Sequence, residues 1–184
     1  MGNPEIKRWA NGQVIIPAGK YTSLKEAVEK EYKNLRYADL RYADLRYADF
    51  SYAELRYTDL LYAKNLNKYI TTPLYSMLDQ IGKIRAYKIV NSKNEGIYNG
   101  GLVYKIGEEV EIKKANTDEF NNCGEGINLA TLDWCIKEYK EGYKILIAEF
   151  TKKDIACIPI GSDGKFRVFR CKIIGEKNLK EIGL

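Results

Sequence analysis

Between Leu35 and Tyr62 the chain repeats nearly the same five residues, and an apolar residue returns at every fifth position. These positions are Leu35, Leu40, Leu45, Phe50, Leu55 and Leu60. A helical face has a period of about 3.6 residues and a pleated strand a period of about 2, so a strict period of five fits neither. The period predicts a chain that winds and buries one large side chain per unit.

The repeated units have the form Ala-Asp-Leu-Arg-Tyr, as in Ala38–Tyr42 and Ala43–Tyr47. Over roughly residues 33–66 they resemble the pentapeptide-repeat family, whose pattern is A-[DN]-L-X-X. The resemblance implies a right-handed quadrilateral β-solenoid with one pentapeptide per side. Residues about twenty positions apart then stack at the spacing of neighbouring strands, about 4.8 Å. Tyr37 is expected on Tyr57, and Tyr42 on Tyr62.

The repeats give only about one and a half turns of a solenoid. Because a structure of this kind needs about three stacked repeats to cover its apolar faces, we expect caps at both ends. Upstream, a capping box at Ser23–Glu26 predicts a short helix, and residues 13–17 read as a strand before it. Downstream, Thr72 as N-cap and Pro73 at the first helical position predict a helix that ends at Gly82.

The outward positions of the repeats hold charges and tyrosines. Acidic and basic residues alternate, which fits either a nucleic-acid contact surface or a solvated ladder of balanced charges; we favour the ladder. The tyrosines either stack on one another at the corners of the solenoid or form an exposed aromatic surface that binds a partner. The charged residues are Asp39, Asp44, Asp49, Glu54, Asp59, Arg36, Arg41, Arg46 and Arg56, and the tyrosines are Tyr37, Tyr42, Tyr47, Tyr52, Tyr57 and Tyr62.

Length and composition allow one solenoidal piece and one globular domain, since the chain has 184 residues, of which 45% are hydrophobic. The predicted segments are 1–33 (strand and capping helix), 34–66 (solenoid), 67–83 (linker helix) and 84–184 (α+β domain). The start, Met1–Ile6, lacks the features of a signal peptide, and the sequence has no membrane-spanning stretch. We expect a cytoplasmic protein, in the host cytoplasm if a phage encodes it.

The chain has no histidine, which removes the Ser-His-Asp and Cys-His arrangements and the common proton donors near neutral pH. The usual glycine-rich phosphate loops are missing as well. The four cysteines have no CxxC spacing and read as buried reduced thiols rather than zinc ligands. The sequence therefore predicts a protein without enzymatic activity, cofactor or metal.

After residue 84 the pattern changes. Strands are expected at 84–90, at 102–112 as a hairpin, and at 143–150, 155–158 and 166–174, with one helix from Leu132 to Tyr139 capped by Thr131. The predicted fold class is α+β. A short right-handed quadrilateral pentapeptide β-solenoid with helical caps precedes a small mixed α+β domain, in which one main helix packs on a twisted sheet.

Residues 84–184 also resemble a C-terminal module of bacteriophage proteins, found in uncharacterised pentapeptide-repeat proteins and in rIIB-like proteins. The segments that carry this resemblance are residues 123–134, 145–150, 154–159 and 164–168. Many relatives have the pattern C-x-x-G-[IL]-H, and Asn128 stands where they have histidine. A looser similarity to ADP-ribosyltransferase-type folds implies a third function, a diverged transferase using Glu125, Glu149 or Tyr98.

The first functional hypothesis is a non-enzymatic binding protein of phage or prophage type. It captures a small anionic or nucleotide-like ligand or a host protein, and a counter-defence role is one form of this function. The candidate ligand-binding residues are Gly124, Gly126, Asn128, Thr131, Trp134, Arg167 and Arg170. The glycines admit close approach of a ligand, the side chains of Asn128 and Thr131 donate and accept hydrogen bonds, Trp134 stacks and the arginines bind negative charge.

Each candidate has a structural alternative. The glycines also suit turns, Trp134 also suits a core, and Arg167 and Arg170 point to opposite faces of a regular strand, so at most one enters a given pocket. The second functional hypothesis is a structural adaptor, in which the solenoid or an open sheet edge forms a homo-oligomer or binds a partner. The modest net charge of +5 does not indicate nucleic-acid binding.

Overall fold

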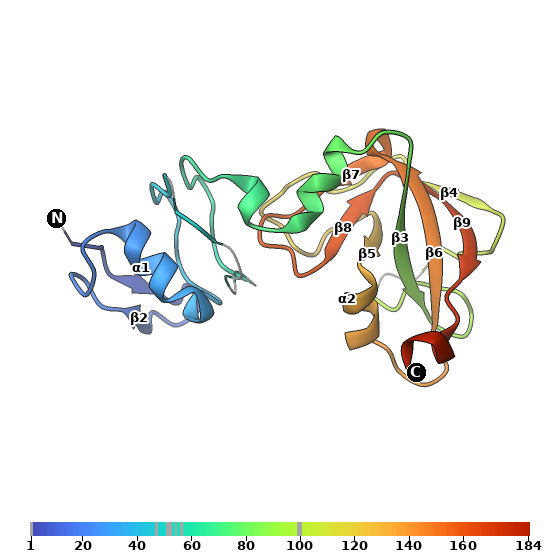
Figure 1. Cartoon of the computed structure of the whole chain (residues 1–184), viewed down its shortest axis with the longest axis horizontal. Coiled ribbons are helices and arrows are strands. Elements are labelled where there is room, and N and C mark those ends of the chain that lie inside the picture. Colours follow the sequence, from blue (N-terminus) through green and yellow to red (C-terminus); the bar gives the residue numbers. More distant parts are fainter. Residues whose placement is uncertain (1, 47, 51–52, 54, 56, 99–100) are drawn as a thin grey trace. The chain divides into compact units, whose positions relative to one another are not determined.

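The computed structural model describes residues 2–46, 48–50, 53, 55, 57–98 and 101–184. The chain divides into two compact units (Figure 1). Unit 1 comprises Met1–Tyr75 and Ile160–Asp163, and unit 2 comprises Ser76–Pro159 and Gly164–Leu184. The short segment Ile160–Asp163 therefore belongs to unit 1, although it lies late in the sequence.

Unit 1 begins with a small antiparallel pair, β1 (Ile6–Lys7) and β2 (Val14–Ile16), followed by helix α1 (Leu24–Lys30) and the 3-10 turn η1 (Tyr32–Asn34). The Ser23 hydroxyl accepts the Glu26 N–H at 3.1 Å, as expected of an N-cap. The predicted strand and helix before the repeats are confirmed.

The apolar residue of each pentapeptide is buried. Leu35, Leu40, Leu45, Phe50, Leu55 and Leu60 are at most 3% exposed and form one core with Ala38, Ala48 and Ile160. The period of five therefore correctly predicted which repeat residues face inward. The core also contains Ile6 and Ile16 of the first strands and Ala27 and Val28 of α1.

Residues twenty positions apart lie side by side where the described residues allow the comparison. Asp39 pairs with Asp59 and Asp44 with Lys64 in isolated parallel bridges, and the Tyr37 and Tyr57 rings stack with centroids 5.1 Å apart. Arg41 binds Asp39 at 2.6 Å and lies 3.6 Å from Asp59, so a cation separates the two stacked carboxylates. The repeat tyrosines Tyr47 and Tyr52 and the charged residues Glu54 and Arg56 lie outside the described residues.

The prediction of a quadrilateral solenoid with helical caps is nevertheless wrong. Over the described part of residues 34–66 the chain forms turns and isolated bridges, and no closed solenoid. The reason is the small number of units: only the first repeats have a partner twenty residues later, and stacked repeats need several layers. The expected helix after Thr72 is the 3-10 helix η3 (Pro73–Asp79), preceded by the short 3-10 turn η2 (Lys68–Ile70).

Four described tyrosines of the repeats have a left-handed backbone, which is uncommon for a bulky residue. Their φ angles are 62° (Tyr37), 59° (Tyr42), 60° (Tyr57) and 59° (Tyr62). The same tyrosines form the stacked pairs, since Tyr42 also stacks on Tyr62 with centroids 5.2 Å apart. The contact between the rings therefore offsets part of the cost of the strained corners.

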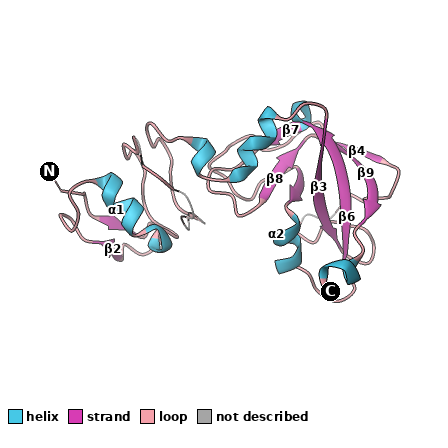
Figure 2. Ribbon diagram, in the orientation of Figure 1, coloured by secondary structure: helices cyan, strands magenta, loops and turns pink. Residues whose placement is uncertain are grey.

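Unit 2 is built on one seven-stranded antiparallel sheet with the order β4-β9-β6-β3-β5-β8-β7, drawn as magenta arrows in Figure 2. Its strands are β3 (Lys83–Val90), β4 (Glu109–Glu111), β5 (Ile127–Ala130), β6 (Lys144–Thr151), β7 (Ile155–Cys157), β8 (Lys165–Val168) and β9 (Arg170–Glu176). β3 and β6 pair over their full length, from Lys83 with Thr151 to Val90 with Lys144. β3 and β5 share only the pair Tyr87–Ala130, so these two strands diverge beside it.

The predicted α+β fold class is also wrong, because the described structure is mostly β-sheet. Helix α2 (Leu132–Lys137) has six residues, and the other helical segments of unit 2 are the short 3-10 turns η4 (Lys152–Asp154) and η5 (Leu179–Ile182). Trp134 and Cys135 of α2 pack with Ile89 of β3 and Ile145 of β6. A single short helix cannot form a second layer, and the strands contribute most of the buried residues of the unit.

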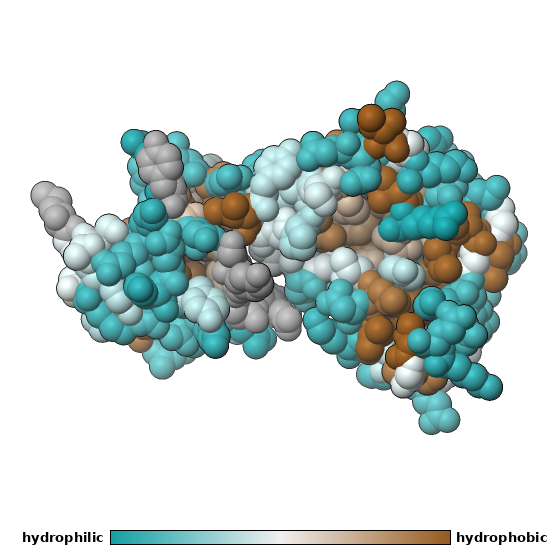
Figure 3. Space-filling model, viewed as in Figure 1, coloured by the Kyte–Doolittle hydropathy of each residue, from teal (hydrophilic) through white to brown (hydrophobic). Residues whose placement is uncertain are grey.

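Exposed apolar side chains are scattered over the surface of unit 2. Figure 3 shows them as brown patches among hydrophilic residues. The most exposed are Ile81, at 96%, Tyr98, at 69%, and Ile106, at 57%. Scattered apolar residues of this kind are normal for a protein surface and do not by themselves define an interface.

Candidate ligand-binding site

Unit 2 contains a cavity of about 840 Å³, within the usual range for small-molecule sites. Strands β3 and β5, helix α2, and the loops before β5 contribute its walls. Its aliphatic lining is formed by Ile89, Ile97, Leu102, Ile112, Leu129 and Ala130. The cavity lies next to the place where β3 and β5 diverge.

The loop that enters β5 forms one wall. The Asn116 N–H donates to the Glu125 carbonyl at 2.7 Å, and a Cβ on Gly124 would lie 2.7 Å from the Cβ of Asn116. The Asn128 side-chain amide donates to the carbonyls of Gly124 and Gly126, at 3.3 and 3.1 Å. Glycine at position 124 is therefore required by the close approach of residue 116, and Asn128 holds the loop in place.

Three aromatic residues, Tyr87, Tyr98 and Trp134, line the cavity. Trp134 is only 7% exposed, and its ring meets the edge of Tyr98 with centroids 6.4 Å apart. The Tyr98 hydroxyl donates to the Glu138 carboxylate, and this hydrogen bond raises the pKa of Tyr98 to about 12. Tyr98 therefore stays protonated at neutral pH and fixes one side of the aromatic wall.

Four lysines and one glutamate line the same cavity, so its charge is positive. Lys113 and Lys114 are exposed and form no ion pair within the described part of the chain. The Lys165 ammonium lies 5.2 Å from the centre of the Trp134 ring and 3.9 Å from the Cys123 sulfur. Cations beside an aromatic wall favour ligands that combine a ring with negative charge.

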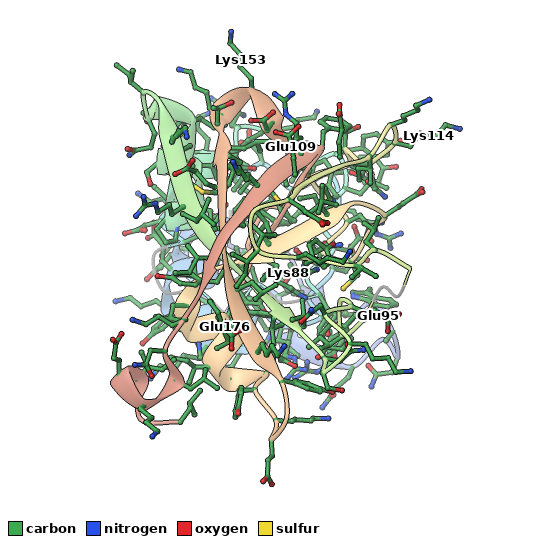
Figure 4. The ribbon with its side chains drawn as sticks, turned by 90° about the vertical axis from the view of Figure 1, so that its right-hand side faces the viewer. Lys88, Glu95, Glu109, Lys114, Lys153 and Glu176 are labelled. Atoms are coloured by element: carbon green, nitrogen blue, oxygen red, sulfur yellow. The ribbon has the colours of Figure 1, made fainter. Side chains whose placement is uncertain are left out.

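The fourth lysine, Lys88, differs from the others because it is buried, at 7% exposed. Its ammonium donates to the Asn128 carbonyl at 2.9 Å and lies 4.8 Å from the centre of the Tyr104 ring. Burial lowers the pKa of Lys88 to about 8. In Figure 4 Lys88 is labelled near the centre of the view, whereas Lys114 and Lys153 extend outward at its edge.

Of the seven residues predicted to bind a ligand, the structure brings Gly124, Gly126, Asn128 and Trp134 together in the lining of this cavity. Thr131, which starts α2, does not line it: its hydroxyl oxygen is buried against Gly164 and has no hydrogen-bond partner among the described residues. The glycines and Trp134 also have structural roles, because the glycines allow close packing of the loop and Trp134 contacts the core.

The two arginines lie outside the lining. Arg167 is completely buried, and its guanidinium donates to the backbone carbonyls of Asn116, Asp118 and Asn121, each at 2.8 Å. Arg170 is half-exposed and binds the Asp154 carboxylate at 2.9 Å. Arg167 therefore acts on the cavity indirectly, by holding the loop before β5.

The sequence-based prediction missed Lys88, Tyr87, Lys113, Lys114 and Lys165. A usable indication existed for Lys88. Alternate residues of β3, namely Ile84, Ala86, Lys88 and Val90, are all buried, so the strand alternation places a lysine on an inward face. No such indication existed for the other lysines, because the residues that meet at the cavity are far apart in the chain.

The cysteines are free. Cys135, Cys157 and Cys171 are buried, whereas Cys123 is exposed, so the expected burial is wrong for Cys123. Among the described residues no cluster of three or more acidic residues or cysteines could hold a metal ion.

A family model for pentapeptide repeats matches residues 34–64 in eight copies. The chain contains pentapeptide repeats. The match stops before unit 2, and no curated protein and no solved structure matches the chain. The resemblance of residues 84–184 to a bacteriophage module is thus without support from these comparisons. No helix in the described ranges has the length and apolar character needed to cross a bilayer.

Proposed function

We propose that this protein binds a small anionic, nucleotide-like ligand in the cavity of unit 2 and does not turn it over. The observation on which this proposal rests is the combination of three aromatic rings and four lysines around one cavity of about 840 Å³. A planar ring can pack against Trp134 and Tyr98, while a phosphate or carboxylate meets the exposed Lys113 and Lys114.

The position of the lysines supports an anionic group rather than a second ring at the mouth of the cavity. Lys113 and Lys114 follow β4 and are exposed, so they retain contact with solvent and with an incoming ligand. Glu125 is the single acidic residue of the lining, and it is exposed as well. The charges favour binding of anions and repel cations.

The proposal is tested by titrating the full chain with nucleoside mono- and diphosphates while following Trp134 fluorescence in a Trp9→Phe background, with calorimetry on the unchanged protein as an independent measurement. We expect saturable binding that weakens as the salt concentration rises, because exposed charge pairs are screened. A protein that ignores the whole panel by both methods would contradict the proposal.

The lysines at the mouth are tested by charge reversal. The double variant Lys113→Glu, Lys114→Glu should bind at least about tenfold more weakly, which corresponds to about 1.4 kcal/mol. The matched control is Lys152→Glu, Lys153→Glu, which changes the net charge equally at an exposed pair outside the cavity. An equal loss in both variants would mean that only the overall charge matters.

The phage or prophage origin and the cytoplasmic location belong to the same proposal. They rest on the resemblance of residues 84–184 to a bacteriophage module. Native mass spectrometry of the protein purified from its own host would reveal a retained ligand or a host protein, and a host protein in place of a small molecule would favour the adaptor hypothesis.

A further inference from the structure

Lys88 is a buried cation for which the described part of the chain supplies no anionic partner. Within the described residues it forms no ion pair, and its only polar contacts are the Asn128 carbonyl and the face of Tyr104. An ammonium has three N–H donors, so these contacts do not satisfy the group fully. A buried charge that is incompletely paired is costly and is retained in a fold mainly where it has a task.

The neighbours of Lys88 do not neutralise it. Cys171 of β9 and Cys135 of α2 are the titratable groups that act on the Lys88 charge, and burial raises the pKa of both thiols to about 12. Burial also raises the pKa of Tyr104. All three therefore remain uncharged at neutral pH, and the desolvated Lys88 amine loses its proton easily.

Lys88 also belongs to the lining of the cavity, together with Asn128, whose carbonyl accepts from its ammonium. We propose that Lys88 forms a reversible imine with the carbonyl carbon of an anionic aromatic aldehyde held in this cavity. This inference rests on the proposed function, because it concerns the same cavity and names the reactive group of its ligand. Desolvation in an apolar pocket is an established way to activate a lysine for this reaction.

The reaction balances without an oxidant or a reductant. The Lys88 ammonium first releases a proton to solvent. The Nζ lone pair of the neutral amine then attacks the carbonyl carbon, and the C=O π pair moves to oxygen to give a carbinolamine after proton transfer. Loss of one water molecule forms the C=N bond, and hydrolysis regenerates both partners. With a pKa of about 8, roughly a tenth of Lys88 is neutral at pH 7.

The structure explains why Lys88 and not another lysine would react. An ordinary lysine, with a pKa of about 10.4, is neutral at pH 7 in fewer than about one molecule in a thousand. The aromatic wall of Tyr98 and Trp134 and the cations Lys113 and Lys114 bind the ring and the anionic group of the aldehyde. Both effects concentrate the reaction at one site.

The experiment uses the full chain with pyridoxal 5′-phosphate as the probe, at a concentration equal to that of the protein. Borohydride reduces any imine to a stable amine, and peptide mapping by mass spectrometry locates it. We expect labelling of Lys88 to exceed that of any other lysine at least about tenfold, given the difference in neutral fraction. Pyridoxine 5′-phosphate, which has an alcohol in place of the aldehyde, is the non-covalent control.

Two matched variants complete the test. Lys88→Arg keeps the charge but cannot form an imine, and it should lose the label while still binding pyridoxine 5′-phosphate. Lys83→Arg changes an exposed lysine of the same strand, bound to Glu149, and should leave the label on Lys88 unchanged. If Lys88→Arg fails to fold, the peptide map of the native protein decides the question alone.

The outcomes separate the two proposals. If pyridoxine 5′-phosphate or a nucleotide binds but no adduct forms at Lys88, the imine is refuted and the proposed ligand cavity stands. Labelling spread evenly over surface lysines also refutes the imine. If neither pyridoxal 5′-phosphate nor pyridoxine 5′-phosphate binds, the imine is refuted. The nucleotide titration with the Lys113 and Lys114 variants then decides the proposed function separately.

Discussion

The position of Lys88 on β3 places a charged side chain among apolar ones. The alternation of β3 directs it inward with Ile84 and Val90, where the other side chains are apolar. Its stem packs as an aliphatic residue would, while its ammonium reaches the Asn128 carbonyl, at the point where β5 has diverged from β3. The lysine therefore bridges strands that the backbone does not pair there.

The stability of the protein should depend on pH through Lys88. The pKa of Lys88 falls from 10.5 to about 8 on folding, so between these values the unfolded state binds more protons and the free energy of unfolding rises with pH. The advantage of Lys88→Met over the native residue should therefore shrink by about 3 kcal/mol from pH 8 to pH 10.5. Urea unfolding followed by Trp134 fluorescence in a Trp9→Phe background measures it. A difference that stays constant with pH would contradict the burial of a charged Lys88.

Arg167 is the second residue whose environment decides its role. A fully buried guanidinium with three backbone acceptors uses the planar fork that distinguishes arginine from lysine. Its partners belong to residues 116–121, a segment without regular structure. The side chain therefore supplies hydrogen bonds that a strand or helix would otherwise provide.

We predict that Arg167→Lys lowers the free energy of unfolding of unit 2 by about 3 kcal/mol, because two of three charge-assisted hydrogen bonds are lost. Arg170→Lys is the matched control. Arg170 is half-exposed and ion-paired, so its replacement should cost less than about 1 kcal/mol. Urea denaturation of both variants measures the difference, and equal losses would show that the three carbonyl contacts contribute little.

At the scale of elements, the repeats and the segment Ile160–Asp163 fit together within unit 1. Gly161 has a left-handed backbone, with a φ of 66°, and a Cβ at this position would lie 2.7 Å from the Cβ of Leu55. Ile160 beside it is a member of the core that the repeats form. Close packing at the end of the repeats thus depends on a glycine from a distant part of the chain.

Replacement of Gly161 by alanine should therefore destabilise unit 1 for two reasons. The left-handed backbone costs an alanine about 1 kcal/mol, and the contact with Leu55 adds about 1–3 kcal/mol of overpacking. Gly19→Ala isolates the first effect, since Gly19 has a φ of 69° and nothing within 4 Å of the added Cβ. Thermal unfolding followed by Trp9 fluorescence in a Trp134→Phe background compares them. Equal shifts would contradict the close contact with Leu55.

At the scale of the whole molecule, two neighbouring isoleucines belong to different units. Ile158 lies in unit 2 and Ile160 in unit 1, and each is 5% exposed. The chain passes from one unit to the other within two residues. The sequence holds one tryptophan in each unit, Trp9 and Trp134, so the two cores can be followed separately.

The paired variants Ile160→Ala and Ile158→Ala test this division. Each should lose about 2–4 kcal/mol, because a buried side chain leaves a cavity. Ile160→Ala should lower the stability reported by Trp9, in the Trp134→Phe background, and Ile158→Ala that reported by Trp134, in the Trp9→Phe background. If both variants shift both signals equally, the chain unfolds as one cooperative body and the division has no energetic meaning.

The candidate site could be predicted only in part. The loop and helix that supply Gly124, Gly126, Asn128 and Trp134 are contiguous in the sequence, and their residue types indicated a ligand. The lysines could not be assigned, since Lys88, Lys114 and Lys165 come from separate strands and loops and meet only in the folded unit. Arg167 was assigned to a ligand because a sequence does not show that its partners are backbone carbonyls.

The amino-acid sequence by itself determined the local geometry. The period of five decided which repeat residues are buried, and the alternation of residues 84–90 predicted the strand that forms there, because backbone geometry fixes these periods. Tertiary structure alone decided the order of the seven strands, the absence of a closed solenoid in the described repeats, and the cavity with Lys88. Each of these depends on contacts between residues distant in the sequence, and such contacts produce no periodic pattern of residue types within a short segment.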